Sequence, residues 1–485
     1  MNSDEKKEKI AQLISKNILV SPELLSEIEK NGYAEVSPEG LILEEGKKEQ
    51  KEDCPETTVP PAAAGSAAVK VLSSYDKKPQ KRGVQDFISY FNSRYSSIEK
   101  LLTNRQGLSN LTSIGRIKGR PSDNVSFIGA VYEKQATKSG NILLSLEDRT
   151  GSIKAVVNSG KKDVFETAQE LVHDEIVGVT GSIRNDILFV NALILPDIMA
   201  NSFLKKSPYE GYAVFLSDMH VGSEMFLSNE FERFIKWICG NQGTEQQRAI
   251  ASKVKYLFLA GDAVDGVGVY PNQQYELSIK DIYGQYKACA ELLSRIPQRI
   301  KIIICPGNHD ATRISEPQPP FSSEFTSALT KLPNIITVSN PSLVNIDSSS
   351  TFPGINVLLY HGYSFDYYVA NVDSIRQKGG YDRADLIMKF LLKRRHLAPS
   401  HTSTLYIPDA EADPLFIDAV PDIFATGHLH KTSVSHYRGV TLISGSCWQS
   451  KTPFQEKLGH KPEPARVPVV NLQTRDVKIL KFGSD

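Results

Sequence analysis

The segment YAVFLSDMHVGS, residues 212–223, joins an unbroken apolar run to the polar residues Asp218 and His220. A short apolar run of this kind is typical of a strand buried on both faces. Four later segments repeat the pattern of an apolar run that ends in polar residues: VKYLFLAGD (254–262), IKIIICPGN (300–308), INVLLYHG (355–362) and DIFATGH (422–428). Because α/β sheets bind ligands at the carboxyl ends of their strands, the sequence predicts one site built from several strand-end loops.

The polar residues after these runs are donors that bind divalent metals. They form the groups Asp218-Met219-His220, Gly261-Asp262, Gly307-Asn308-His309-Asp310, His361-Gly362 and Gly427-His428-Leu429-His430. Carboxylate, imidazole and amide oxygen suit Mn, Fe or Zn, and two ions ~3.5–4 Å apart can hold both the attacking and the leaving oxygen of a phosphoester. One carboxylate must bridge them, and Asp262 is the natural candidate because it lies in the middle of the series. We therefore expect two divalent metal ions, with Mn²⁺ supporting activity and Fe or Zn as alternatives.

Glycine precedes a candidate ligand at three of these strand ends. Gly261, Gly307 and Gly427 are expected to let the backbone turn sharply and approach a ligand without a Cβ clash. Each motif alone is common by chance, but five of them in this order, all at strand ends, are specific. The remaining histidines are assigned to the surface or the core: His173, His396, His401, His436 and His460.

The motif series resembles that of the calcineurin-like metallophosphoesterase superfamily, whose pattern is DxH, GD, GNHD or GNHE, H and GHxH. The resemblance covers residues 212 to about 450 and implies a sandwich of two β-sheets flanked by helices. It implies one metal held by Asp218, His220, Asp262 and His430, and a second held by Asp262, Asn308, His361 and His428. It also implies that His309 lies over the phosphate, where it stabilises charge or protonates the leaving oxygen, with Asp310 as its orienting partner.

Residues 114–200 change from helical to strand periodicity. Five short apolar runs are separated by turn signals such as Ser139-Gly140 and Asn185-Asp186: SFIGAVYEK, NILLSLED, GSIKAVVN, EIVGVTGSI and ILFVNALIL. A helix-like stretch, VFETAQELV, lies between the third and fourth runs. Five strands with a helix after the third is the order of an OB-fold barrel, a common platform for single-stranded nucleic acid. A small barrel used only for protein contact is the alternative.

Upstream of the barrel the sequence divides into three parts. Residues 1–43 carry apolar residues at helical spacing and are predicted to form a small helical module. Residues 44–82 are charged and then rich in proline and alanine, so we expect a flexible linker. Residues 83–113 lead into the barrel and contain an amphipathic helix over 84–105, whose aromatic residues are assigned to the core in preference to base stacking. Residues 211–485 form the predicted phosphoesterase domain, in which VPVVNL and DVKILKF complete a sheet.

The order of these parts resembles the small subunits of archaeal D-family DNA polymerases. The resemblance rests on FISYFNSRYSSIEKLLTNR (87–105), DMHVGS (218–223) and GNHDATR (307–313), and it extends over about residues 84–485. It implies a proofreading 3'→5' exonuclease that hydrolyses DNA phosphodiesters and releases 5'-mononucleotides. The implied partners are a large catalytic subunit, primer–template DNA with single-stranded 3' ends and, through the complex, a sliding clamp. Two alternatives stay open: a non-catalytic scaffold subunit of the polymerase, and a phosphodiesterase unrelated to DNA.

Two segments near these motifs have two interpretations each. The aromatic residues of YSFDYY either stack on a DNA base or pack in the core or against a subunit: Tyr363, Phe365, Tyr367 and Tyr368. The basic residues of the amphipathic helix KFLLKRRHL either contact the DNA backbone or form a solvated helix face: Lys393, Arg394 and Arg395.

Composition sets outer limits on the function. The 485 residues include 56 Lys+Arg and 56 Asp+Glu, so the net charge of zero excludes a uniformly basic nucleic-acid coat protein but not a local basic groove. No apolar run approaches the ~18 residues of a membrane span, and the charged start MNSDEKKEKI lacks the apolar core of a signal peptide. Five scattered cysteines without a CxxC pair predict neither a disulfide scaffold nor a cysteine zinc ribbon. We expect a cytoplasmic, multidomain α+β protein without a membrane partner.

Overall fold

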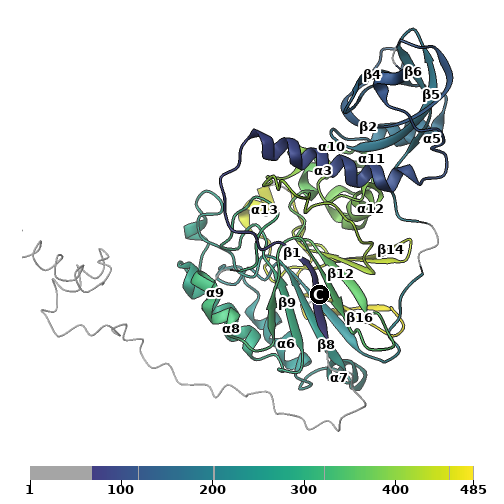
Figure 1. Ribbon diagram of the computed structural model, residues 1–485. Coiled ribbons are helices and arrows are strands. Elements are labelled where there is room, and N and C mark those ends of the chain that lie inside the picture. Colours follow the sequence, from purple (N-terminus) through teal and green to yellow (C-terminus); the bar gives the residue numbers. More distant parts are fainter. Residues whose placement is uncertain (1–67, 118, 200–202, 322, 458, 484–485) are drawn as a thin grey trace, which may run out of the picture. The chain divides into compact units, whose positions relative to one another are not determined.

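The computed structural model describes residues 68–117, 119–199, 203–321, 323–457 and 459–483, with elements labelled as in Figure 1. The helical module predicted for residues 1–43 and the predicted linker up to residue 67 lie outside these ranges. Among the residues within them, no helix is both long and apolar enough to cross a membrane.

The prediction of a flexible linker through residue 82 is wrong for its last part. Residues 69–74 form strand β1 (Val69–Ser74), which pairs antiparallel with β11 (Ser342–Ile346). Its β-branched residues suit a strand, and its partner lies far along the chain, where a search for local apolar periodicity does not reach. Beyond β1, the Lys77 ammonium lies 2.8 Å from carboxylate oxygens of both Asp409 and Glu411.

Two six-stranded sheets are formed by β1 and the strands from residue 212 onward. The first has the order β10 (Ile335–Thr337), β9 (Lys301–Cys305), β8 (Val254–Ala260), β7 (Tyr212–Leu216), β16 (Arg466–Asn471), β17 (Val477–Lys481). The second has the order β1, β11, β12 (Ile355–Leu359), β13 (Ile423–Thr426), β15 (Val440–Ser444), β14 (Ser433–Tyr437). Strands β7, β8 and β9 are parallel neighbours, and β12 is parallel to β13, so their carboxyl ends share an edge within each sheet. The two predicted C-terminal strands are confirmed as β16 and β17.

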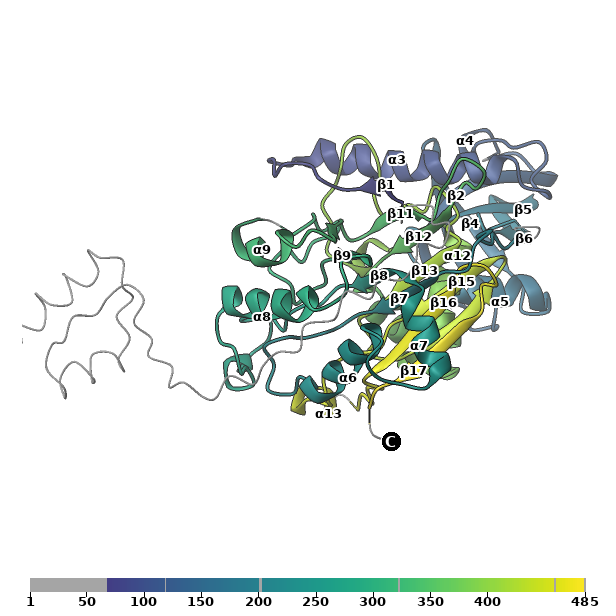
Figure 2. The same cartoon turned by 90° about the horizontal axis from the view of Figure 1, so that it is seen from below.

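The two sheets pack face to face, and helices cover their outer faces (Figure 2). Alternation along β7 shows the cause, because Phe215 joins the core between the sheets whereas Val214 and Leu216 join the core under the helices. The first sheet packs against α6 (Ser228–Ile238), α7 (Glu245–Ser252), α8 (Ile282–Ser294) and α9 (Ser323–Thr330). The second packs against α10 (Phe365–Asn371), α11 (Asp373–Gln377) and α12 (Ala384–Arg394). Short elements complete this unit: η1 (Gln273–Tyr275), η2 (Gly380–Asp382), η3 (His401–Ser403) and α13 (Pro453–Lys457).

The predicted five-stranded barrel is confirmed. Its strands close in the order β2 (Ser122–Ala136), β3 (Ile142–Asp148), β4 (Gly151–Val157), β6 (Ile187–Ile194), β5 (Ile176–Arg184). Helix α5 (Lys162–Glu170) follows the third strand, as in an OB-fold. The short helix α4 (Ile114–Ile117) buries both of its isoleucines in the barrel core.

The aromatic helix is confirmed as α3 (Val84–Thr103), and it contacts both the barrel and the two-sheet unit. The Tyr95 hydroxyl donates to the carbonyl oxygen of Ile128 in β2 at 2.7 Å. The Arg94 Nε donates to Asp413 of the two-sheet unit at 2.6 Å. Tyr90 is buried as expected, but Phe87 keeps 40% of its surface exposed.

Candidate metal centre

The candidate ligands come together from both sheets. Asp218, Asp262 and Asn308 follow β7, β8 and β9 of the first sheet, whereas His361 follows β12 and His428 follows β13 of the second. The remaining two candidates, His220 and His430, each lie two residues beyond one of these strand-end positions. All seven side chains are buried except those of Asn308 and His428, which are half-buried. The parallel strand ends therefore converge as the sequence predicts.

One group of donors surrounds the space between Asp218 and His430. His430 Nε2 lies 3.1 Å from His220 Nε2 and 3.4 Å from Asp218 Oδ1. The Asp262 Oδ2 atom lies 3.8 Å from His220 Nε2. These are the four residues that the resemblance assigns to the first metal.

The second group of donors is centred on the amide oxygen of Asn308. Asn308 Oδ1 lies 2.9 Å from His361 Nε2 and 3.0 Å from His428 Nδ1. His361 Nε2 lies 3.3 Å from Asp262 Oδ2. The same oxygen of Asp262 therefore faces an imidazole of each group, which is the position of a bridging carboxylate.

The spacing of these atoms fits divalent cations. Donors bonded to one ion at about 2.1 Å lie roughly 3.0–3.4 Å apart in tetrahedral or octahedral geometry. Most of the separations above fall in or next to that range. The donor set, with imidazole nitrogens, carboxylates and one amide oxygen, is of the kind that binds Mn, Fe or Zn.

Three of the imidazoles are oriented by partners on their other ring nitrogen. His220 Nδ1 lies 3.0 Å from Asp265 Oδ1, and His361 Nδ1 lies 2.9 Å from the carbonyl oxygen of Ala260. His428 Nε2 lies 3.0 Å from Asp366 Oδ2. When each of these nitrogens donates a hydrogen bond, the opposite nitrogen turns a lone pair towards the centre, as metal-binding histidines require.

Two of these orienting residues, Asp265 and Asp366, were missed by sequence reasoning. Asp265 lies three residues after Asp262 in GDAVDG, and a second acid so close to a motif carboxylate was the available signal. Asp366 lies inside YSFDYY, a segment that was interpreted only through its aromatic residues.

The backbone at the site is held in an uncommon conformation. Five of the seven candidate ligands have positive φ: Asp218 (50°), His220 (51°), Asp262 (51°), His428 (71°) and His430 (55°). A positive φ is uncommon for residues other than glycine, and such strained residues concentrate at functional sites. The surrounding sheets therefore force these side chains to converge at a conformational cost.

The role predicted for the three glycines agrees with the close packing of the site. A Cβ on Gly307 would lie 2.2 Å from Asp262 Oδ1, and one on Gly261 would lie 2.3 Å from His361 Nδ1. A Cβ on Gly427 would lie 2.6 Å from Asp218 Oδ2. Each larger residue would displace a candidate ligand.

Electrostatics keep the central carboxylate ionised. Burial acts to raise the pKa of Asp262, but the neighbouring imidazoles of His361, His309 and His220 together hold that pKa well below its usual value. Burial acts to lower the pKa of His361, but the Asp262 and Asp218 carboxylates raise it to about 10. The centre thus favours positive charge beside its carboxylates.

His309 lies against the first donor group, but Asp310 does not orient it. A ring nitrogen of His309 lies with His220 and Asp262 in a cluster whose donor atoms are all within 4.8 Å of one another. His309 Nδ1 is 2.7 Å from the carbonyl oxygen of Asp265. The Asp310 carboxylate instead accepts from the Gly307 amide at 2.8 Å and from the Tyr286 hydroxyl at 3.1 Å. The predicted pairing of the two residues is wrong because the backbone turns Asp310 inward, where it fixes the motif loop.

The YSFDYY segment divides between core and cavity. Phe365 and Tyr368 are fully buried in the core under α10 and α12, so they cannot stack on a base. Tyr363 and Tyr367 are half-buried and line a cavity beside the centre. The Tyr363 ring lies edge-on to His428, with centroids 5.8 Å apart.

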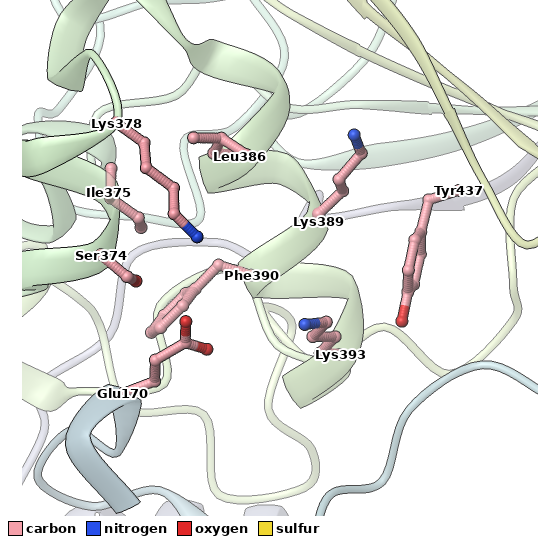
Figure 3. Close-up of a pocket in the computed structure, with 9 residues that line it drawn as sticks. All are labelled: Glu170, Ser374, Ile375, Lys378, Leu386, Lys389, Phe390, Lys393 and Tyr437. Atoms are coloured by element: carbon pink, nitrogen blue, oxygen red, sulfur yellow. The ribbon is translucent and has the colours of Figure 1, made fainter. Parts of the chain in front are cut away.

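Neither interpretation of the basic helix holds for Arg394 and Arg395. The Arg394 guanidinium is buried and lies 3.0 Å from Glu175 of the barrel, and Arg395 donates to the carbonyl oxygen of Ile417 at 2.9 Å. These arginines hold structure together and are neither solvated nor open to DNA. Lys393 is half-buried and, with Lys378 and Lys389, borders a cavity of about 170 Å³ (Figure 3).

Two regions of the chain match models of known protein families. Residues 213–435 match the family model of the DNA polymerase alpha/epsilon B subunit, and residues 125–191 match the model of an OB-fold nucleic acid binding domain. The two-sheet unit is thus similar to the B subunits of DNA polymerases, and the barrel is an OB-fold.

Curated relatives narrow this class. The DNA polymerase II small subunit of Archaeoglobus fulgidus is 38% identical over 484 residues, covering 98% of this chain and 95% of its own. That of Methanothermobacter thermautotrophicus is 39% identical over 415 residues, covering 85% of this chain and 83% of its own. The chain belongs to the family of archaeal DNA polymerase II small subunits.

Similarity to solved structures is weaker. An archaeal phosphodiesterase aligns with 56% of this chain and 98% of its own at 12% identity, with a TM-score of 0.25. The asparaginyl-tRNA synthetase of Pyrococcus horikoshii aligns with 17% of this chain and 21% of its own at 24% identity, with a TM-score of 0.16.

Proposed function

We propose that the two-sheet unit has the metallophosphoesterase fold and holds two divalent cations. Asp218, His220, Asp262 and His430 would hold one cation, and Asp262, Asn308, His361 and His428 the other. The observation that supports this most strongly is the position of Asp262 Oδ2, which faces His220 at 3.8 Å and His361 at 3.3 Å. Mn²⁺ is the ion proposed for activity, with Fe or Zn as alternatives.

The proposed reaction is 3'→5' exonuclease hydrolysis of DNA, which proofreads newly made ends. Two bound divalent cations supply Lewis-acid stabilisation of the phosphate and lower the pKa of water, so no serine or cysteine nucleophile is required. Water adds to phosphorus and the bond to the leaving 3' oxygen breaks, which releases a 5'-mononucleotide and a new 3'-OH end. Relatives that are polymerase subunits, together with an OB-fold barrel, favour DNA as the substrate.

His309 is the proposed charge-stabilising or proton-donating residue. Its Nδ1 faces the Asp265 carbonyl oxygen at 2.7 Å, which fixes the ring beside the first donor group. Burial lowers its pKa while the Asp262 carboxylate opposes that shift, and the phosphate of a bound substrate would add negative charge that favours the protonated ring.

The proposed partners follow from the family. The chain would assemble with a large catalytic polymerase subunit, receive single-stranded 3' ends from the primer–template and reach a sliding clamp only through the complex. A non-catalytic scaffold role uses the same fold and partners, so the two roles differ in turnover alone.

The exonuclease role and the scaffold role are distinguished by Mn²⁺-dependent digestion of a 3'-mismatched primer–template. The purified chain is tested alone and with the large subunit. We expect stepwise shortening from the 3' end, lowered about 100-fold or more in the His309→Ala variant. No digestion in either setting by protein that contains metal would establish the scaffold role instead.

A further inference from the structure

A cavity of about 690 Å³ opens beside the candidate metal centre. Its walls come from the YSFDYY segment, from residues 401–406 and from Phe87 of α3. Sites that bind small ligands have volumes of roughly 300–1,000 Å³. The cavity is therefore large enough for a nucleoside but too small for the paired end of a duplex.

The cavity is joined to the metal centre through His428. Asp366, which lines the cavity, contacts His428 Nε2 with its Oδ2 at 3.0 Å, while His428 Nδ1 faces Asn308 in the centre. Tyr363 lies edge-on to the same imidazole, with centroids 5.8 Å apart. A ligand in the cavity would thus be separated from His428, a member of the second donor group, only by Asp366 and Tyr363.

The lining offers aromatic faces and hydroxyl groups, and the imidazole that borders it, His401, already pairs with the Asp174 carboxylate. Tyr363, Tyr367 and Tyr406 contribute rings, Thr402 is exposed, and Leu405 keeps 57% of its surface exposed. None of the described lining residues is lysine or arginine, so the cavity suits the base and sugar of a nucleotide better than its phosphate. Aromatic side chains bind bases of any sequence by stacking.

We propose that this cavity binds the unpaired 3'-terminal nucleoside of a DNA strand while its phosphodiester lies at the metal centre. The inference rests on the proposed exonuclease function and deepens it. A terminal base enters the cavity only after it leaves its pairing partner, and a mismatched base does so at lower cost. The cavity therefore selects frayed ends, and Tyr363 and Tyr367 set this specificity by contact with the base.

The test compares two single-stranded oligonucleotides that differ only at the 3' terminus, one with a natural base and one with an abasic tetrahydrofuran. The full chain with Mn²⁺ is expected to cleave the natural end with a kcat/KM about tenfold higher, in line with the weaker values measured for base–aromatic stacking. Tyr363→Leu and Tyr367→Leu should each lower kcat/KM on the natural end and leave it unchanged on the abasic end.

Control variants separate stacking from other effects. Tyr367→Phe keeps the ring and removes only the hydroxyl that accepts a hydrogen bond from Ser400 at 3.2 Å, so the roughly tenfold preference for the natural end over the abasic end should survive in this variant. Tyr209→Leu removes a tyrosine that is 56% exposed and precedes the amino end of β7, and it should change neither rate. An equal loss on both substrates, or no loss on either, would overturn the inference.

A binding measurement keeps the inference testable if the proposed function fails. If the wild-type chain cleaves neither oligonucleotide, fluorescence anisotropy gives the Kd of each. A roughly tenfold preference for the natural end, lost in Tyr363→Leu and Tyr367→Leu, would support the cavity without catalysis. Equal Kd values for the two wild-type complexes would overturn it.

Discussion

Two buried polar clusters in the chain satisfy their charges in different ways. Where α3 meets the two-sheet unit, Asp413 Oδ2 accepts from Arg94 Nε at 2.6 Å and lies 2.7 Å from His396 Nε2. In the metal centre, Asn308 Oδ1 lies at 2.9–3.0 Å from two imidazoles, and two further imidazole nitrogens face each other at 3.1 Å. In the first cluster, the carboxylate is paired directly with an arginine and a histidine of the protein. In the second, the side-chain nitrogens and oxygens surround a common point at distances that suit a bound cation.

The two clusters differ in the source of the positive charge that offsets their buried carboxylates. The Arg94 guanidinium, with His396, overcomes burial and holds the pKa of Asp413 well below its usual range. Asp262 also has a lowered pKa, but only imidazoles supply the opposing charge there. At the junction, the positive charge is a permanent part of the protein, namely the Arg94 guanidinium. In the candidate metal centre, we infer that exchangeable cations supply it.

The largest expected effect comes from removing the bridging carboxylate. Asp262→Ala should lower the kcat of the proposed exonuclease by about 1,000-fold, because both proposed cations would lose a ligand. Metal content measured by mass spectrometry should fall with it. Asp76→Ala, which removes an exposed carboxylate, should change neither quantity. Full metal occupancy in Asp262→Ala would contradict a bridging role for Asp262.

The matching change at the junction should affect stability instead of activity. Arg94→Met leaves the Asp413 carboxylate buried without its cation, which typically costs about 3–5 kcal/mol. Urea denaturation of the metal-free protein measures this loss of unfolding free energy. The control is Arg116→Met, which replaces an exposed arginine. A loss below about 1 kcal/mol would show that Arg94 is not needed to offset the buried charge of Asp413.

A smaller effect is expected from the residue that orients His220. Asp265 Oδ1 faces His220 Nδ1 at 3.0 Å, and loss of such a partner typically lowers metal affinity by about 10–100-fold. Calorimetric titration with Mn²⁺ should show this loss in Asp265→Asn. An unchanged affinity for Mn²⁺, with an unchanged melting temperature, would show that Asp265 does not orient His220 for metal binding.

The smallest effect is a pH dependence of the junction. Because the folded-state pKa of Asp413 is lowered, the stability it contributes is fully present above its unfolded pKa of about 3.9 and is lost as the pH falls below that value. The difference in unfolding free energy between wild type and Asp413→Asn should therefore shrink from pH 5 to pH 3. A difference that grows as the pH falls over this range would show that the folded-state pKa of Asp413 is not lowered.

Sequence reasoning succeeded where local pattern and chain order carry the information. Five apolar runs with a helix after the third predicted the barrel, and polar motifs at strand ends predicted which side chains meet. These features hold because register and strand direction follow from alternation and from short connections. Strand direction brings Asp218, Asp262 and Asn308 to one edge of the first sheet, and the packing of the two sheets against each other adds His430.

What failed depends on partners that are distant in sequence. β1 pairs with β11 across most of the chain, and Arg394 is buried because Glu175 of the barrel lies 3.0 Å away. Neither partner can be predicted from the sequence immediately around β1 or Arg394. The orientation of Asp310 failed for a different reason, since it depends on how one tight loop turns. The positive φ values of the ligands were likewise beyond reach, because tertiary structure imposes them.

Whether the centre binds two cations is tested most simply by anomalous diffraction at the manganese edge from crystals of the chain grown with Mn²⁺. Two peaks should flank Asp262, one beside Asp218, His220 and His430 and the other beside Asn308, His361 and His428. No peak among these residues, or a single one that leaves either group of donors empty, would contradict a two-cation centre.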